Sequence, residues 1–328
     1  MEENKSLWIR NIDFDNLKDL LHIVSANDGK LRALELEKIA VEEGILIKNN
    51  GKPLARSPKY FYRKALENID IAYVKKYRYY VSDNIWAKKL LQNSIYKSSL
   101  SYEQKEPLRE LLIQNKDCRH HFFDLFMGQK KYDLNLFRSS GTEVVVITKS
   151  MNNSINHNKR NKNIIYEGVS GNSIELNSQD LVFAIHEGIR KWALNLDLVD
   201  EYILKFEDGR IIYPICPNID NSKISELFFD AVKNVNTDSE WSIIHIPKLI
   251  SDIALQTRFP IEAIKNQISN LYKNNPQYIM FIKSSTAFID ISTPFEKQDN
   301  AFRKLYLNLH KEGYISHIRV NKQMLAEK

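Results

Sequence analysis

The chain of 328 residues has only two cysteines, Cys118 and Cys216, and they lie far apart in the sequence. Two thiols cannot form a disulfide framework or a cysteine-rich zinc site, so their scarcity indicates a reducing compartment. The N-terminus is acidic and leads into no apolar run of signal-peptide length. No segment approaches the roughly 20 apolar residues that a membrane span needs. We therefore expect a cytoplasmic protein without a membrane partner.

Glycine is also scarce, with ten residues spread thinly along the chain. No glycine-rich phosphate loop and no Gly-x-Ser-x-Gly turn is present. His186-Glu187 lacks the second histidine of a zinc-protease helix. Cys118 and His121 share a predicted helix face, but no second pair of ligands follows, so a buried thiol is the simpler interpretation. The sequence thus predicts no catalytic residue, no metal site and no cofactor.

One enzymatic alternative stays open, a metal-dependent nuclease with its site in the middle of the chain. Such a site needs an acid followed by Glu-x-Lys on one strand. Glu143 and Lys149 share a strand face, but six residues separate them by roughly 20 Å. A closer set has the motif in reversed order, and we prefer to interpret it as the charged solvent face of a hairpin; it consists of Asp200, Lys205, Glu207 and Asp208.

The charge balance permits anionic partners without requiring them. Lys and Arg number 47 against 41 acids, a formal charge of +6 with a pI near 9.0. Hydrophobic residues make up 43% of the chain, which is ordinary for a folded protein, and the length predicts two or three domains. Local clusters of charge therefore carry more information than the total.

The most informative cluster lies between residues 57 and 83. Ser57 before Pro58 predicts a helix start, with a hydroxyl cap and a proline in the first turn. An apolar face follows at helical spacing, formed by Phe61, Ala65, Leu66 and Ile69. The pattern then changes to two short strands, 71–74 and 79–81. We expect the helix and hairpin to contact a phosphate backbone through Lys59, Tyr60, Arg63, Lys64, Lys75, Lys76 and Arg78.

Two amphipathic helices, 14–26 and 31–43, and a polar loop, 48–53, precede this cluster. The order of helix, helix, helix and hairpin over residues 14–83 resembles a winged helix-turn-helix domain. The connection before the third helix is longer than the 3–4-residue turn of the plain motif. The resemblance implies a DNA-binding fold.

The middle of the chain is predicted to be a mixed α/β region. Within it, the polar tract at 150–163 has almost no apolar residues to bury and is predicted to be a flexible loop. Helices are predicted at 84–97, 102–115, 117–127, 178–195 and 222–234. Strands are predicted at 143–148, 164–169 and 173–177. An Asp-Gly pair at 208–209 predicts a hairpin between 202–206 and 211–215.

The C-terminal part repeats the opening order of elements. Helices at 247–256 and 260–273 flank a short turn, and strands at 278–283 and 287–291 follow. This arrangement over residues 243–292 also resembles a winged helix-turn-helix, which we expect to be followed by a helix at 296–312 and a strand at 314–320. Side chains that can read base edges or contact a phosphate face outward from its second helix: Asn266, Ser269, Asn270 and Lys273.

The sequence therefore predicts an α+β protein with two winged-helix modules flanking a mixed α/β middle region. Domain boundaries are expected at 1–98, 99–238 and 239–328. The leading hypothesis is a non-catalytic DNA-binding protein, either a regulator or the DNA-recognising subunit of a bacterial mobile-element or defence complex. The alternative from another class is a scaffold whose winged helices bind protein, because a fold does not fix a function. Protein partners and a homo-oligomer are compatible with both.

Overall fold

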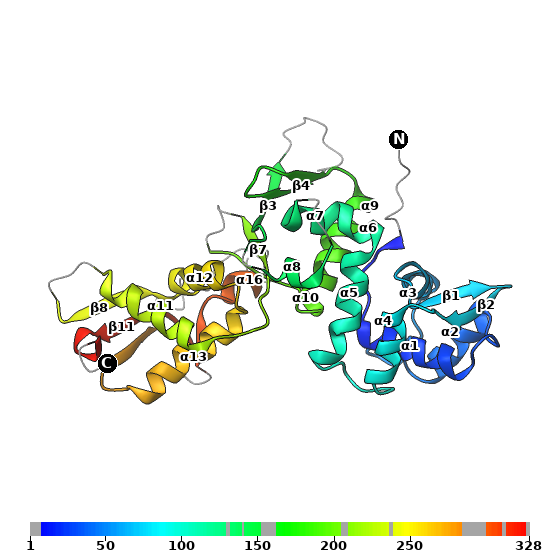
Figure 1. Cartoon of the computed structure of the whole chain (residues 1–328), viewed down its shortest axis with the longest axis horizontal. Helices are drawn as coiled ribbons and strands as arrows, with labels where there is room; N and C mark the ends of the chain where they lie inside the picture. The colour runs from blue at the N-terminus through cyan, green and yellow to red at the C-terminus, as the bar shows by residue number, and fades with distance from the viewer. Residues whose placement is uncertain are drawn as a thin grey trace. The chain divides into compact units, whose positions relative to one another are not determined.

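The structure is a computed structural model that describes residues 8–128, 132–139, 141–151, 162–204, 209–235, 239–283, 300–309 and 313–325. It is a mixed α+β fold with several small sheets (Figure 1). Among these residues, no helix is long and apolar enough to cross a membrane. The predicted flexible loop at 150–163 lies mostly outside the described residues, although strand β3 (Val145–Met151) and strand β4 (Lys162–Gly168) extend into its two ends.

The described residues fall into two compact units. The first contains residues from 1–137, 150–164 and 174–198, and the second contains residues from 138–149, 165–173 and 199–328. The expected boundaries at residues 98 and 238 stay predictions. Each unit is described by itself below.

The first unit begins with three helices and a hairpin, the blue to cyan part of the ribbon in Figure 1. Helix α1 has Asp13 as its N-cap and buries an apolar face formed by Phe14, Leu17, Leu20, Leu21 and Val24. Strands β1 and β2 pair antiparallel, and an isolated bridge joins Arg32 to Arg78 at the outer side of β2. The segment before α2 is thus a minimal third strand. The elements are α1 (Phe14–Ala26), α2 (Ala33–Glu42), α3 (Arg56–Asn68), β1 (Ala72–Lys75), β2 (Arg78–Val81) and α4 (Ile85–Asn93).

The predicted start of α3 is wrong by two residues. The helix begins at Arg56 with Ala55 at the N-cap position, so Ser57 lies inside the first turn and caps nothing. Tyr62 is buried on the inner face, whereas Phe61 is only half-buried. The Tyr62 hydroxyl accepts a hydrogen bond from the Asp13 amide at 2.9 Å, which gives this buried tyrosine a polar partner at the start of α1.

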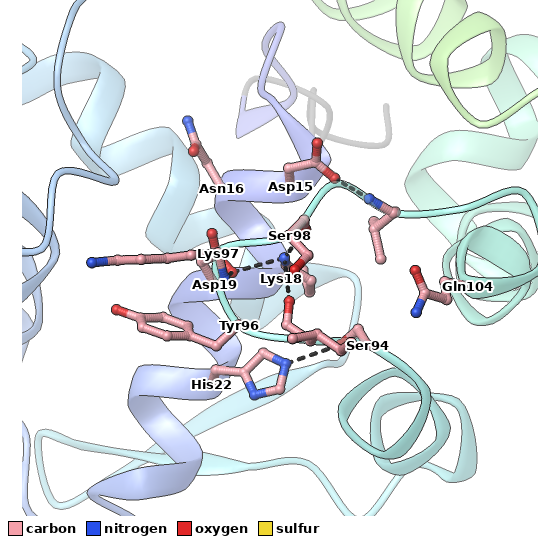
Figure 2. Close-up of polar contacts among 12 residues, drawn as sticks. Asp15, Asn16, Lys18, Asp19, His22, Ser94, Tyr96, Lys97, Ser98 and Gln104 are labelled. Carbon is pink, nitrogen blue, oxygen red and sulfur yellow. Dashed lines mark hydrogen bonds and ion pairs between the residues drawn. The ribbon is translucent and has the colours of Figure 1, made fainter.

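A buried lysine fixes the segment after α4 against α1, as Figure 2 shows. Lys18 is fully buried, and its Nζ lies 2.8 Å from a carboxylate oxygen of Asp19. It also donates to the Ile95 carbonyl at 2.8 Å and to the Ser98 carbonyl. A buried ammonium must be paired and hydrogen-bonded, so the chain after α4 has to follow this path.

His22, one turn further along α1, extends the same contact (Figure 2). Its Nε2 lies 3.0 Å from the Ser94 hydroxyl, which itself donates to the Leu90 carbonyl at 2.5 Å. Because that hydroxyl proton is used, Nε2 must be the donor, which is compatible with the neutral ring. Burial, and then the neighbouring Lys18 charge, lower the pKa of His22.

The rest of the first unit packs aromatic residues around short helices. The helical turns at 119–123 and 182–189 are wider π-type turns. Gly188 in the second turn lets the backbone near Ile9 approach, because a Cβ there would lie 2.8 Å from an Ile9 methyl group. The elements are η2 (Glu103–Lys105), α5 (Glu106–Gln114), α6 (Lys116–Cys118), η3 (Arg119–Phe123), α7 (Asp124–Met127), α8 (Leu134–Phe137), β5 (Ser173–Leu176), α9 (Gln179–Leu181), η4 (Val182–Ile189) and α10 (Arg190–Asn195).

A five-stranded sheet has the order β5-β4-β3-β7-β6. Strand β6 spans Val199–Tyr202 and pairs antiparallel with β7 (Arg210–Pro214), and β7 also pairs with β3. The hairpin predicted from the Asp-Gly pair is present, but its first strand ends at Tyr202 instead of beginning there. All four side chains of β6 are buried. The strand therefore lacks the alternation of buried and exposed residues from which a strand can be predicted.

The second unit carries a second set of helices and strands around one apolar core. Strand β11 lies between β8 and β9 and is antiparallel to both. The predicted strand at 287–291 lies outside the described residues, and the partner of β9 comes from further along the chain. The predicted helix at 296–312 is wrong at 307–309, which form a strand that pairs with β11. The elements are α11 (Asn221–Lys233), β8 (Trp241–His245), α12 (Ile246–Thr257), α13 (Ile261–Asn274), β9 (Ile279–Lys283), α16 (Asn300–Arg303), β10 (Leu307–Leu309), β11 (Gly313–Asn321) and η6 (Lys322–Leu325).

The Lys18 contact yields a stability prediction. Lys18→Met keeps the length of the side chain but removes the charge, which leaves the two carbonyls and Asp19 without their donor. We expect a loss of about 3 kcal/mol in the free energy of unfolding. Calorimetry should show the melting transition of the first unit about 6–12 °C lower. The control Lys38→Met removes a 76% exposed side chain paired at 3.8 Å and should change stability by less than about 0.5 kcal/mol. Equal melting of the two variants would contradict a structural role for Lys18.

Candidate nucleic-acid interface

Two of the predicted phosphate-binding cations on α3 are engaged in ion pairs within the first unit. Arg63 Nε lies 2.7 Å from Glu37 of α2, and Lys64 Nζ lies 2.8 Å from Glu67 of α3. The Tyr79 hydroxyl of β2 donates to the other Glu67 oxygen at 2.8 Å. Burial, and then this bond, raise the pKa of Tyr79 well above its ordinary value, so the hydroxyl keeps its proton. The network positions α3 against α2 and the hairpin.

The N-terminal half of α3 presents the remaining predicted residues. Lys59 is half-buried, whereas Tyr60 is 41% exposed. The Tyr60 ring lies 5.7 Å from the Arg63 guanidinium and 6.0 Å from the Lys64 ammonium, which is cation–π range. Four of the predicted residues therefore lie together on one helix: Lys59, Tyr60, Arg63 and Lys64.

The hairpin tip carries exposed positive charge. Lys75 and Lys76 are exposed, and within the described part of the chain neither side chain has an interaction partner. Arg78 is exposed and donates to the Gly29 carbonyl at 3.1 Å. Between these cations stands Tyr77, whose side chain is 84% exposed. The tip therefore presents three cations and one aromatic ring to solvent.

The backbone of this tip is strained. Lys75 pairs with Arg78, so only two residues form the turn, and both have positive φ, 48° at Lys76 and 64° at Tyr77. Such a turn is the kind that natural hairpins build with Asn-Gly, because side chains with a Cβ disfavour this region. Strain of this type persists where another requirement selects the residues.

The helix and the hairpin are brought together around an open groove of about 600 Å³. Leu34 at its edge is 79% exposed and Val74 is 43% exposed, which is unusual for large apolar side chains. Of the predicted residues, the groove collects only Arg63 and Lys64, both on α3. The hairpin and α2 contribute residues that the sequence did not single out. It is lined by Arg32, Ala33, Leu34, Glu35, Arg63, Lys64, Glu67, Val74, Tyr77 and Tyr79.

A second arrangement near α3 was not predicted. The Arg10 guanidinium lies between two aromatic rings, 4.9 Å from Phe61 of α3 and 5.6 Å from Phe183 of η4. Arg10 also pairs with Asp180 at 3.4 Å. The close backbone approach at Gly188 places the segment around Ile9, and hence Arg10, beside η4. No sequence signal links residues so far apart, although an arginine beside exposed aromatics is a common pairing.

In the second unit, the predicted side chains lie together on the outward face of α13. Asn266, Asn270 and Lys273 are exposed, and Ser269 is half-buried. None of these four has a partner in the part of the chain that the structure describes. The opposite face buries Ile261, Ile264, Ile268 and Leu271. On the flank of the helix, Gln267 donates to Ser225 of α11 at 2.9 Å, which fixes the rotation of α13 and hence the direction of the amides.

The acidic candidate for a nuclease site has a structural role. Asp200 is buried at the start of α13, where it accepts the Ile261 amide at 3.0 Å and pairs with Lys304. Glu143 accepts the Ser170 amide at 3.3 Å. Lys205, Glu207 and Asp208 lie outside the described residues, and so does the side chain of Lys149. In the described residues, no group of three or more His, Cys, Asp or Glu side chains is placed to hold a metal.

The other residues considered from the sequence as parts of a metal or catalytic site are core or surface residues in the structure. Cys118 is fully buried, and burial raises the pKa of its thiol well above the ordinary value. The side chain of His121 is not among those described. His186 is buried within η4, and Glu187 pairs with Lys191 on the same helix.

Comparisons of the chain with protein-family models, with curated proteins and with solved structures find no match.

The strained turn yields a second stability prediction. Replacing Lys76 by Asn and Tyr77 by Gly supplies the residues that a two-residue turn with positive φ prefers. We expect the double variant to gain about 1 kcal/mol of stability and to melt about 2–4 °C higher in the transition of the first unit. The control Lys75→Asn changes the adjacent strand residue and should bring no gain. An unchanged or lower melting temperature in the double variant would show that the turn is relaxed.

Proposed function

We propose that the protein binds duplex DNA, without catalysis, through two winged-helix modules. The order of elements supports this proposal. In the first unit a helix, a bridging segment at 31–32, two helices and two strands follow one another, and β2 lies between the bridging segment and β1. In the second unit α11, β8, α12, α13 and β9 follow one another, and β11, which comes after α16 and β10, lies between β8 and β9. The second module thus begins at α11, earlier than the sequence indicated.

The observation that carries the proposal is the hairpin tip. The exposed Lys75 and Lys76 side chains lack partners in the part of the chain that the structure describes, so they are available to replace the counterions of a phosphate backbone. A turn that keeps Lys-Tyr at the cost of backbone strain is explained if those side chains contact a ligand. In this arrangement α3 enters a groove of the duplex and the tip contacts the adjacent backbone.

The two helices differ in the chemistry that they offer. On α3, Arg63 and Lys64 are already paired with carboxylates, so we propose that they position the helix. The electrostatic contribution to DNA affinity then comes from the hairpin tip. On α13, Asn266 and Asn270 present unpaired amides, and an amide can donate to and accept from one adenine edge. The first module then supplies affinity and the second supplies sequence preference, as in a regulator or the recognition subunit of a larger complex.

A scaffold that binds protein is the second candidate. The exposed apolar side chains at the groove favour it, since Leu34 and Val74 have no role in contacting phosphates. The salt dependence of binding separates the two candidates, because counterion release belongs to nucleic acid.

The first functional prediction concerns the tip. Changing Lys75 and Lys76 together to Ala should weaken binding to all duplex sequences. The slope of log K against log salt concentration should flatten by about one to two units, because each phosphate contact contributes about 0.9. Fluorescence anisotropy with a labelled duplex, titrated at several salt concentrations, measures this slope. Lys38→Ala, a change to an exposed cation outside the groove, is the matched control and should leave the slope unchanged.

A wild-type slope near zero would instead support the scaffold. If the wild type has a normal slope and the double variant has the same slope, the protein binds DNA but the hairpin tip is not part of the interface.

The second functional prediction concerns base recognition by α13. With the preferred duplex first selected from a random pool, Asn266→Ala and Asn270→Ala should each cost about 1–3 kcal/mol on that duplex and much less on random DNA. Asn308→Ala alters another exposed amide of the same unit and should cost nothing on either. Equal losses on both DNAs would make the two amides backbone contacts.

A further inference from the structure

The outer face of the C-terminal sheet is a surface that the proposed duplex-binding residues do not use. Along β8, β9 and β11, side chains alternate between the apolar core and solvent. The core side packs against α11, α12 and α13 (Figure 1). The outward positions are Trp241, Ile243, His245, Met280, Ile282, His317 and Arg319.

Strand pairing arranges these side chains as rows. One row contains Ile243, Arg319 and Met280, and the next contains His245, His317 and Ile282. Two residues along a strand advance roughly 6.6 Å, so the rows lie next to one another. The sheet therefore presents one contiguous surface.

Planar groups form a strip across this surface. The Arg319 guanidinium lies 4.8 Å from the Trp241 ring, and the rings of His245 and His317 lie 5.0 Å apart. Burial, and then the neighbouring His317, lower the pKa of His245, which favours its neutral ring. Imidazole rings, an indole and a guanidinium are all groups on which nucleobases stack.

Three aliphatic side chains border the strip and remain open to water. Ile243 is 55% exposed, Met280 is 47% exposed and Ile282 is 38% exposed. Exposed apolar side chains that cluster in this way mark a binding surface. No outward position carries a carboxylate, and Arg319 supplies a fixed positive charge. The partner must therefore combine apolar faces with negative charge.

We propose that this sheet face binds single-stranded nucleic acid, with bases stacked on the planar strip and against the aliphatic side chains. Duplex DNA does not fit this surface, since its base faces are stacked on one another and only edges and phosphates are accessible. An unpaired strand offers both faces of each base together with a phosphate for Arg319. This activity is separate from the proposed duplex binding.

The test uses the full chain and a fluorescein-labelled oligothymidylate of about 12 nucleotides. Anisotropy should detect binding, and Arg319→Ala and Met280→Glu should each weaken it at least about tenfold, since stacking contacts are of this size. Lys233→Ala removes an exposed cation on α11, away from the sheet face, and should change nothing. Binding should also quench tryptophan emission, and Trp241→Phe should remove most of that quenching although three other tryptophans remain.

Absence of oligothymidylate binding, or equal affinity in wild type, Arg319→Ala and Met280→Glu, would overturn the proposal. So would self-association in sedimentation velocity that Met280→Glu abolishes while oligothymidylate binding stays intact, because the face would then be a protein interface.

A labelled duplex and the Lys75→Ala/Lys76→Ala variant run in parallel keep the two proposals distinguishable. If the sheet proposal holds, the tip variant retains oligothymidylate binding and the sheet variants retain duplex binding. If sheet variants lose both ligands equally with their circular dichroism unchanged, a separate single-strand site is overturned.

Discussion

The first unit depends on how a buried ammonium is satisfied. Lys18 lies in the α1 interface with no access to water, so it needs acceptors on every side. Asp19 supplies one charge, and two carbonyls after α4 supply the rest. This requirement fixes the chain after α4 on α1, and α4 follows directly from β2. The hairpin is consequently held at both ends, by α3 before it and by α4 after it, and its tip projects from a rigid base.

The cations of this module are of two kinds, those paired with a carboxylate and those that are unpaired within the described residues. A charge that holds a helix in place is paired with a carboxylate and contributes little net field, as for Arg63 with Glu37. Lys75 and Lys76, where the chain turns back, are unpaired within the described residues, which is the condition that the proposed binding of a polyanion requires. The positive charge of an element in the sequence is therefore a poor guide to its role until the pairing is known.

Much of the fold follows from local pattern. The helix at 14–26 was predicted to the residue because capping and a 3.6-residue apolar period agree there. Strand β6 was misplaced because it is buried on all sides and does not alternate. The residues of the candidate site were named from composition, but the Arg63–Glu37 and Lys64–Glu67 pairs, the strain at Lys76 and Tyr77, and the pairing of β11 with both β8 and β9 depend on long-range packing. No periodicity in a single sequence encodes those contacts.

In the second unit, the two faces of one small sheet have different surroundings. Because side chains alternate along a strand, the inner positions of β8, β9 and β11 pack in one core with α13, the helix that carries Asn266 and Asn270, and the outer positions lie on the opposite face. A one-residue shift in register would exchange the two sets, which would bury Arg319 and expose Ile318. The pairing that makes α13 rigid therefore also determines the composition of the opposite face. That face lacks carboxylates because the sequence places none at the outward positions. Its side chains lie next to one another because the three strands pair in this register.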